Sequence, residues 1–327
     1  MSEIQINYFY GLYPSTAYGN LILVDPILPP KKCALNCITC PVRHDAKTLQ
    51  RGQSPRPEAI IEDIAEKLPT NVNLNGILLW GSGDPLCLTN APEIVFSLKL
   101  FYSSMQPGHG VFVHTNFLWL LEACNGAYTE AISSIKSLIE CVDGFIVPFL
   151  WYGAEKYLLG WPREKPIVAY LELLKGLLKH DRNKLLPEVH VFRIYNTLYP
   201  GHSHVDELIT AFRHVKVETI VLKPIDRPSH NLNVKPVPGS YVKWLSERFV
   251  EEGFKVIVDT QTTIQTQPRW KKTAVVLYNH ILRMPLKYVE VKSMYGDFGT
   301  IALNNLLSKG LATRITWGGD VYYVGTC

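Results

Sequence analysis

Three cysteines near the start of this sequence have the residue type and spacing best suited to chemistry. Cys33, Cys37 and Cys40 lie in the stretch PPKKCALNCITCPV, spaced C-x3-C-x2-C, in a chain with seven cysteines in total. Thiolates this close can ligate one small metal centre, but zinc sites and iron–sulfur clusters normally take four ligands. His44 is the only other Cys or His close in sequence. A cubane cluster held by three thiolates leaves one iron open to a small molecule; the alternatives are a zinc knuckle or unpaired core cysteines.

A glycine-rich turn follows about 40 residues later, in the stretch GILLWGSGDPLCL. Residues 76–80 form an apolar run that predicts a strand, and residues 81–83 (Gly-Ser-Gly) have so little side-chain bulk that a ligand can approach the backbone. Asp84 then places a carboxylate beside this opening, and Pro85 stiffens the exit. The turn therefore predicts a place where a ligand can approach both the backbone and a carboxylate.

Together, these two motifs resemble the signature of the radical S-adenosylmethionine (SAM) superfamily. The stretches YGLYPSTAYGNLILVDPILPP and VLKPIDRPSHNLNVKPVP are similar to the wyosine-synthase-like and MoaA-like branch, so the resemblance covers about residues 8–260. Two positions depart from the family pattern. Asp84 stands where the family's Gly-Gly-Glu-Pro segment has Glu, and Thr39 stands where an aromatic residue is common.

The resemblance implies an enzyme in which the three cysteines hold a [4Fe-4S] cluster and the open iron binds SAM. Cleavage of SAM then gives a 5′-deoxyadenosyl radical that abstracts hydrogen from a substrate. The positions expected to bind SAM are Thr39, Ser82, Gly83, Asp84, Pro85, Asn116 and Arg193. For Asn116 the alternative is a turn cap, and for Arg193 it is an ordinary surface arginine.

Three further residues are candidates for substrate binding: His114, Lys223 and Arg227. Lys223 ends a predicted strand, where it could contact substrate, form a Schiff base or have a purely structural role. Arg227 could bind phosphate or carboxylate, or could anchor its loop through a salt bridge.

The resemblance suggests RNA, and tRNA in particular, as the substrate. Wyosine synthases of this branch carry further cysteines upstream for a second cluster, however, and this chain has none before Cys33. A peptide or small metabolite is therefore an alternative substrate, and an iron–sulfur sensor that acts without catalysis is an alternative function. The enzyme would need a low-potential electron donor such as ferredoxin or flavodoxin.

Composition is that of a globular protein with a sizeable core. Hydrophobic residues make up 47% and charged residues 19%, with a net charge of +4 and a sequence pI of about 8.5. This mild basicity is compatible with nucleic acid but far from that of a dedicated binder. The start MSEIQINYF resembles no signal peptide, no apolar run approaches the roughly 20 residues that span a bilayer, and the cysteine number is odd. We expect a cytoplasmic protein with no membrane partner.

Hydrophobic periodicity predicts alternating strands and helices, and hence an α/β fold with a parallel sheet. Right-handed crossovers would curl this sheet into the partial (β/α)6 TIM-type barrel of radical SAM enzymes. The predicted strands are 20–24, 76–80, 111–115, 144–150, 188–195, 217–223 and 254–258. The predicted helices are 57–67, 91–104, 127–140, 166–179, 204–214 and 239–252. Polar groups at the strand ends should meet at one rim.

The last part of the chain changes character after the polar stretch 260–269. Helices over 273–283, 287–295 and 300–309 and a hairpin at Gly318–Gly319 resemble a small winged-helix domain. We expect two domains, a radical SAM core at 1–262 and a winged-helix-like domain at 270–327. The third helix has one basic residue, which favours a docking module for tRNA or a protein over a DNA reader. A chain cut at about residue 265 is expected to keep its cluster.

Overall fold

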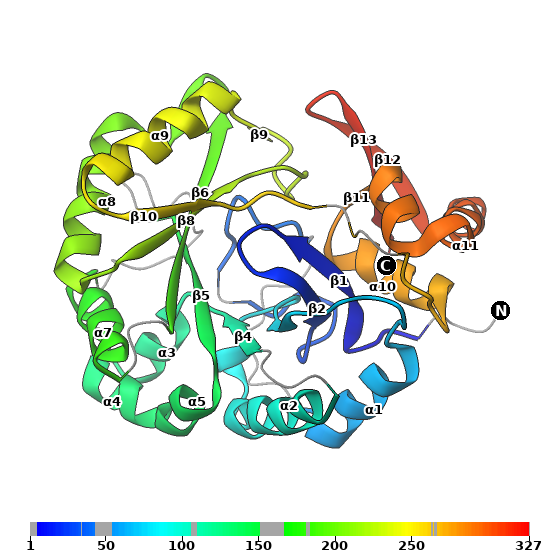
Figure 1. Ribbon diagram of the computed structural model, residues 1–327, viewed down its shortest axis with the longest axis horizontal. Helices are drawn as coiled ribbons and strands as arrows, with labels where there is room; N and C mark the ends of the chain where they lie inside the picture. Colours follow the sequence, from blue (N-terminus) through cyan, green and yellow to red (C-terminus); the bar gives the residue numbers. More distant parts are fainter. Residues whose placement is uncertain are drawn as a thin grey trace.

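The computed structural model describes residues 5–33, 35–42, 54–105, 110–150, 167–180, 184–262, 264 and 267–326. It is a mixed α/β structure whose main sheet curls into a half-barrel (Figure 1). The strand order is β1-β2-β3-β4-β5-β6-β8-β10; β1 and β2 are antiparallel, and the strands from β2 to β10 are parallel. The predicted partial barrel is therefore confirmed at the level of a curled α/β sheet.

The parallel strands lie close to the predicted ranges, and the sheet has one additional main strand at its N-terminal edge. Its members are β1 (Phe9–Ser15), β2 (Gly19–Val24), β3 (Gly76–Leu79), β4 (Gly110–His114), β5 (Gly144–Phe149), β6 (Leu185–Ile194), β8 (Thr219–Pro224) and β10 (Lys255–Val258). Two short strands, β7 (Thr197–Tyr199) and β9 (Val234–Lys235), pair antiparallel with β6. Sequence reasoning missed β1 because Gly11 and Pro14 interrupt its apolar pattern.

Helices cover the outer face of the sheet (Figure 1). They are α1 (Pro57–Lys67), α2 (Ala91–Met105), α3 (Leu118–Ala123), α4 (Tyr128–Ser134), α5 (Lys136–Cys141), α7 (Ile167–His180), α8 (His202–Val215) and α9 (Gly239–Glu251). The single helix expected over 127–140 was wrong, because the backbone leaves the helical region at Ile135 (φ −115°, ψ 16°) and separates α4 from α5. The isoleucine spacing was nevertheless informative, since Ile135 and Ile139 are both buried.

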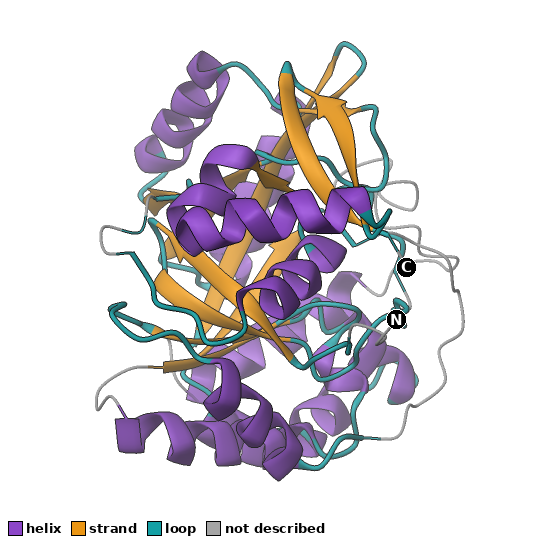
Figure 2. Cartoon of the chain, turned by 90° about the vertical axis from the view of Figure 1, so that its right-hand side faces the viewer, coloured by secondary structure: helices purple, strands orange, loops and turns teal. Residues whose placement is uncertain are grey.

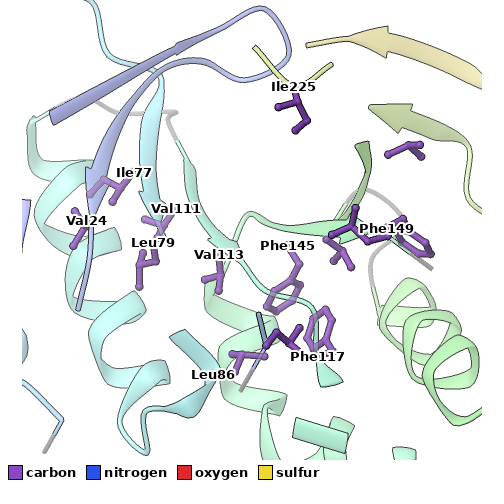
Figure 3. Close-up of a cluster of buried hydrophobic side chains, with 14 of the residues drawn as sticks. Val24, Ile77, Leu79, Leu86, Val111, Val113, Phe117, Phe145, Phe149 and Ile225 are labelled. Atoms are coloured by element: carbon purple, nitrogen blue, oxygen red, sulfur yellow. The ribbon is translucent and has the colours of Figure 1, made fainter. Parts of the chain in front are cut away.

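Alternation along the strands divides their side chains between two faces. Outward residues such as Val24, Leu79 and Val113 join the large core beneath the helices (Figure 3). Inward residues, such as Leu78 and Ile146, form a smaller cluster inside the half-barrel. Because successive side chains point to opposite faces, the residues two positions further along, Trp80 and Pro148, also face the interior.

The C-terminal segment contains two helices and a three-stranded sheet (Figure 2). Its elements are α10 (Thr273–Arg283), β11 (Leu286–Lys287), α11 (Tyr288–Ser308), β12 (Ala312–Trp317) and β13 (Asp320–Gly325), with sheet order β11-β13-β12. The two helices expected over 287–295 and 300–309 are the halves of α11, which is kinked at Gly296 (φ 64°). The predicted hairpin has Gly318 and Gly319 at its tip, both with positive φ.

This segment packs directly against the N-terminal strands. Arg283, at the end of α10, is fully buried, and its Nε donates a 2.7 Å hydrogen bond to Oδ2 of Asp25, just after β2. The Trp270 ring stacks between Phe9 of β1 and Tyr295 of α11, with centroid distances of 6.1 and 4.7 Å. An ion pair and an aromatic stack therefore join the two ends of the chain.

A buried histidine at this junction predicts acid sensitivity. His280 faces Gly11, where a Cβ would lie 2.4 Å from its Nδ1, and that nitrogen is 2.7 Å from the Tyr295 hydroxyl. Burial, and then the charges of Arg227 and Arg283, lower the pKa of His280 to about 3. The unfolded chain, with an ordinary histidine pKa of about 6.5, binds more protons between these values, so stability falls as the pH drops through this window.

We therefore expect the unfolding free energy to fall by roughly 2 kcal/mol more in wild type than in His280→Asn between about pH 6.5 and pH 4.5. Urea titrations of the metal-free proteins at both pH values measure this difference. Above about pH 6.5 the two pH profiles should run parallel. Equal acid losses in the two proteins would contradict the assignment.

Candidate functional site

The curled sheet encloses a cavity on its inner face, and most of the predicted site residues border it. The side chains come from the cysteine loop, from the turn after β3 and from the later parts of β4, β5, β6 and β8. Predicted residues that line the cavity are Cys33, Cys37, Thr39, Cys40, Gly83, Asp84, His114, Asn116, Lys223 and Arg227. The convergence of strand ends on one rim therefore places these residues together. His44 lies outside the described residues.

The cysteine loop is held in place from both sides. The amide of Lys32 donates to the carbonyl of Ser82 at 2.7 Å, which ties the start of the loop to the glycine-rich turn. At the other end, the amide of His230 donates to the carbonyl of Cys40 at 3.0 Å. Between them, the amide of Cys40 donates to the carbonyl of Cys37 at 2.9 Å and closes a turn. The thiols are thus presented by an anchored loop.

The electrostatics of the loop suit a bound metal centre. Burial raises the pKa of Cys33 to about 11 and also raises that of Cys37, so neither thiol ionises readily without a cation. Buried Lys31 donates a 3.0 Å hydrogen bond to Sγ of Cys40. Burial alone would lower the pKa of Lys31. The combined effect of Cys40, Cys33 and Cys37 is larger, so the pKa lies above its usual value. Metal binding replaces the protons of such thiols, and Lys31 offsets part of the negative charge.

The spacing of the cysteine sulfurs can be compared with that of a zinc site. In tetrahedral zinc sites with Zn–S bonds of about 2.3 Å, the sulfurs lie about 3.8 Å apart. Among the described residues, only His114, Glu188 and His190 form a trio whose potential ligand atoms all lie within 4.8 Å of one another. The three cysteine sulfurs therefore do not all lie within 4.8 Å of one another, so they are not arranged as a preformed zinc site.

The glycine-rich turn packs closely against neighbouring segments of the chain. A Cβ on Gly83 would lie 2.4 Å from the carbonyl oxygen of Lys32, and one on Gly81 (φ 153°) would lie 2.4 Å from Cγ of Asp25. Ser82 is buried and donates a 2.7 Å hydrogen bond to Oδ2 of Asp25. Gly81 and Gly83 border the cavity, whereas Ser82 and Pro85 do not line it. Ser82 therefore supports the turn from behind.

Asp84 links the glycine-rich turn to the residues that follow β4, at the edge of the cavity. Its Oδ1 accepts a 3.0 Å hydrogen bond from the amide of Leu86, and its Oδ2 accepts from the hydroxyl of Thr115 at 2.9 Å and the amide of Asn116 at 3.2 Å. Burial raises the pKa of this carboxyl despite these bonds. Asn116 in turn accepts a hydrogen bond from the amide of Leu118 at 2.9 Å, so it caps a turn while it borders the cavity.

Two of the basic candidates, Lys223 and Arg227, have structural partners. Lys223 forms a 2.5 Å ion pair with buried Asp259 and also contacts the Tyr13 hydroxyl. Arg227 pairs with Asp226 at 3.0 Å and reaches the C-terminal segment, donating to the carbonyl of Pro285 at 3.1 Å. Both nevertheless border the cavity.

Arg193 is not brought to the site. Its side chain is exposed on β6, and its Nε donates to the carbonyl of Pro236 at 3.1 Å. It extends beyond the rim because β6 continues past the neighbouring strands to pair with β7 and β9. The structure therefore favours the surface alternative for this arginine.

Sequence reasoning missed two residues that line the cavity, Glu188 and His190. Oε2 of Glu188 lies 3.1 Å from Nε2 of His190 and 3.8 Å from Nε2 of His114. Burial raises the pKa of Glu188, but hydrogen bonds from the two histidines and the charge of Lys223 outweigh burial and lower it well below the usual range. The sequence did contain a signal for them. Glu188 and His190 are two residues apart in the predicted strand 188–195, and residues two apart on a strand lie on the same face.

Comparison with known proteins shows only distant similarity. No protein-family model matches the chain. Three structures of SuiB from Streptococcus suis, one with its precursor peptide SuiA and one with S-adenosylmethionine, align with 72–73% of this chain at 12–13% identity and TM-scores of 0.44–0.48. The chain spans about half the length of those proteins, since 48–51% of each is covered. These values are too low to carry a function to this chain.

One curated protein, the GTPase Obg of Brachyspira hyodysenteriae (strain ATCC 49526 / WA1), is 26% identical over 99 residues. The match covers 30% of this chain and 14% of that protein. A GTPase P-loop has the pattern G-x4-G-K-[ST], and this sequence contains no Gly-Lys pair. The local match therefore gives no ground for proposing GTP hydrolysis here.

None of the helices in the described part of the chain has the length and apolar character needed to span a bilayer.

Proposed function

We propose that this protein is a radical SAM enzyme in which Cys33, Cys37 and Cys40 hold a [4Fe-4S] cluster. The observation that carries the proposal is the meeting of the three-cysteine loop with the Gly-Ser-Gly-Asp turn at one cavity, joined by the hydrogen bond between Lys32 and Ser82. When bound, such a cluster supplies the open iron and the electron with which SAM is cleaved to a hydrogen-abstracting radical.

The residues of this chain have separate tasks in that function. The three thiols ligate the metal, while Lys31 donates a hydrogen bond to Sγ of Cys40 and offsets negative charge. The backbone of Gly81 and Gly83, which borders the cavity, and the carboxyl of Asp84 offer hydrogen-bonding groups for the methionine end of SAM. Asp84 can bind SAM while it accepts its three hydrogen bonds from within the chain, because each carboxylate has about four lone-pair sites.

Substrate hydrogen abstraction requires a shielded space, because a radical must be kept from water and oxygen. Apolar side chains make up much of the cavity wall, among them Leu78, Trp80, Ile146 and Met284. Such a wall excludes water and positions a substrate by contact. A low-potential ferredoxin or flavodoxin is the proposed electron donor.

For the substrate, the resemblance to the wyosine-synthase-like branch makes tRNA the class to test first. Mass spectrometry of tRNA nucleosides and metabolites from a deletion strain and its parent separates the possibilities. A nucleoside that changes supports RNA modification, and an unchanged nucleoside profile with an altered peptide or metabolite supports the other substrate classes.

The C-terminal segment is proposed to recruit a macromolecular partner as a winged-helix-like unit. The order α10-β11-α11-β12-β13, with α11 kinked into two halves, supports this proposal. The second half of α11 exposes Phe298 (77%) and Ile301 (57%) together with Asn304 and Asn305. Apolar and amide groups with little positive charge suit a protein surface better than a phosphate backbone.

Anaerobic reconstitution tests the proposed function directly. We expect about four sulfides per chain with the matching iron, and 5′-deoxyadenosine and methionine after reduction with dithionite in the presence of SAM. The triple Cys33→Ala, Cys37→Ala, Cys40→Ala variant should lose both, whereas Cys141→Ala, outside the cavity lining, should keep both. Zinc in place of iron would refute the cluster. A complete cluster that never cleaves SAM would favour the iron–sulfur sensor.

A further inference from the structure

Three side chains beside the cysteines have the arrangement of a mononuclear metal site. Nε2 of His114, a carboxylate oxygen of Glu188 and a ring nitrogen of His190 all lie within 4.8 Å of one another, and no other trio of potential ligands in the described residues does so. Ligand atoms that share one ion at bond lengths of about 2.0–2.2 Å lie roughly 3–4 Å apart. The separations from Oε2 of Glu188, 3.1 Å to His190 and 3.8 Å to His114, fall in that range.

The sheet brings these residues together from two strands that are not neighbours. Glu188 and His190 are two positions apart on β6, so both face the interior. His114 ends β4, and β5 lies between β4 and β6. The β5 residue paired with Glu188 is Pro148, which also lines the cavity. Its compact ring lets the imidazole of His114 and the carboxylate of Glu188 approach across the strand.

Two further side chains orient the trio. Oγ1 of Thr39 lies 2.9 Å from Nδ1 of His190, the ring nitrogen that points away from Glu188. The hydroxyl of Tyr18 donates to Oε1 of Glu188 at 3.5 Å. Metal-ligating histidines and carboxylates characteristically hold such outer partners, which fix the ring tautomer and the carboxylate direction. Glu188 is only 5% exposed, and a bound cation would add to the charge of Lys223 in stabilising its buried carboxylate.

We propose that His114, Glu188 and His190 bind one divalent first-row transition-metal ion in the same cavity as the cysteine loop. Two imidazoles and one carboxylate form a donor set suited to ions such as Fe²⁺, Mn²⁺ or Zn²⁺. Three protein ligands leave coordination positions open to the cavity. The ion would use them to hold a substrate through a negatively charged oxygen, such as that of a carboxylate or phosphate, beside the cysteines. This site is additional to the proposed cluster and uses none of its ligands.

Binding of Mn²⁺ tests the site in the full-length, cluster-loaded protein. Mn²⁺ prefers oxygen and nitrogen donors to thiolates, and free Mn²⁺ is counted by its electron paramagnetic resonance signal while the oxidised [4Fe-4S] cluster is silent. We expect one bound Mn²⁺ per wild-type chain. Glu188→Gln and His190→Gln should weaken binding by about 10-fold or more. The matched control Glu207→Gln, on the exposed side of α8, should bind as wild type does.

Two outcomes would overturn the proposal: wild type that leaves Mn²⁺ free, or Glu188→Gln that binds it as tightly as wild type does. In either case the trio is a hydrogen-bonded ion pair without metal. The wild-type titration needs no variant, and the sulfide content of each variant reports whether its fold is intact. Because sulfide content and SAM cleavage are measured separately, failure of this proposal and failure of the proposed function are distinguishable.

Discussion

A chain that ends at residue 265 is expected to lose cooperative folding and, with it, the ability to hold a cluster. This reverses the expectation from sequence, in which no presumed ligand lay beyond Arg227. The truncation removes Arg283 and leaves the buried carboxylate of Asp25 without its counter-ion, at a cost of about 3–5 kcal/mol. It also removes Met284, which belongs to the same buried cluster as Tyr10 and Leu23 and lines the cavity; burial of this side chain contributes about 1.5–3 kcal/mol.

Together these losses approach the whole stability of a typical domain, about 5–15 kcal/mol. Urea unfolding followed by circular dichroism, and sulfide content after reconstitution, measure the effect against the full-length chain. A truncated protein that unfolds cooperatively and keeps its full sulfide content would show instead that residues 270–327 are a separable domain, as their composition suggests.

Replacing Arg283 by Met is expected to lower the unfolding free energy by about 3–5 kcal/mol, because one partner of a buried ion pair is removed. The guanidinium bonds Asp25 at 2.7 Å and donates to the carbonyls of Asn7 at 2.8 Å and Asn279 at 3.0 Å. The same oxygen of Asp25 accepts from Ser82. We therefore also expect weaker SAM binding, since the glycine-rich turn loses a fixed support.

A double-mutant cycle with Asp25→Asn isolates the contribution of the Arg283–Asp25 ion pair to the free energy of unfolding. The double variant should recover part of the loss, because it leaves no unpaired charge buried. The matched surface control is Arg213→Met, which breaks the exposed contact with Glu252 and should cost less than about 1 kcal/mol. Equilibrium dialysis with SAM measures the second effect. A cost for Arg283→Met as small as that of the control would show that the ion pair is not what joins the C-terminal segment to the barrel.

Much of the architecture could be predicted from local patterns in the sequence. Apolar runs of strand length between helical stretches predicted the seven parallel strands and the curled sheet, because a strand buried on both faces must be apolar along its length. The close spacing of Cys33, Cys37 and Cys40 and the small residues at 81–83 identified two motifs that were expected to meet at one rim of the sheet. These features depend on neighbours in sequence, so periodicity and composition are sufficient to find them.

Other features depend on residues far apart in sequence. His114 and Glu188 meet only because β4 and β6 flank β5, and Arg283 reaches Asp25 only because α10 packs on β1. A period of two indicates that Glu188 and His190 share a face, but it does not say what faces them. Likewise, the composition of residues 270–327 indicates a change of architecture, whereas the buried ion pair with Asp25 makes that segment part of the site's support. Sequence patterns report which face of an element a residue occupies, and tertiary packing alone determines which charges are buried together.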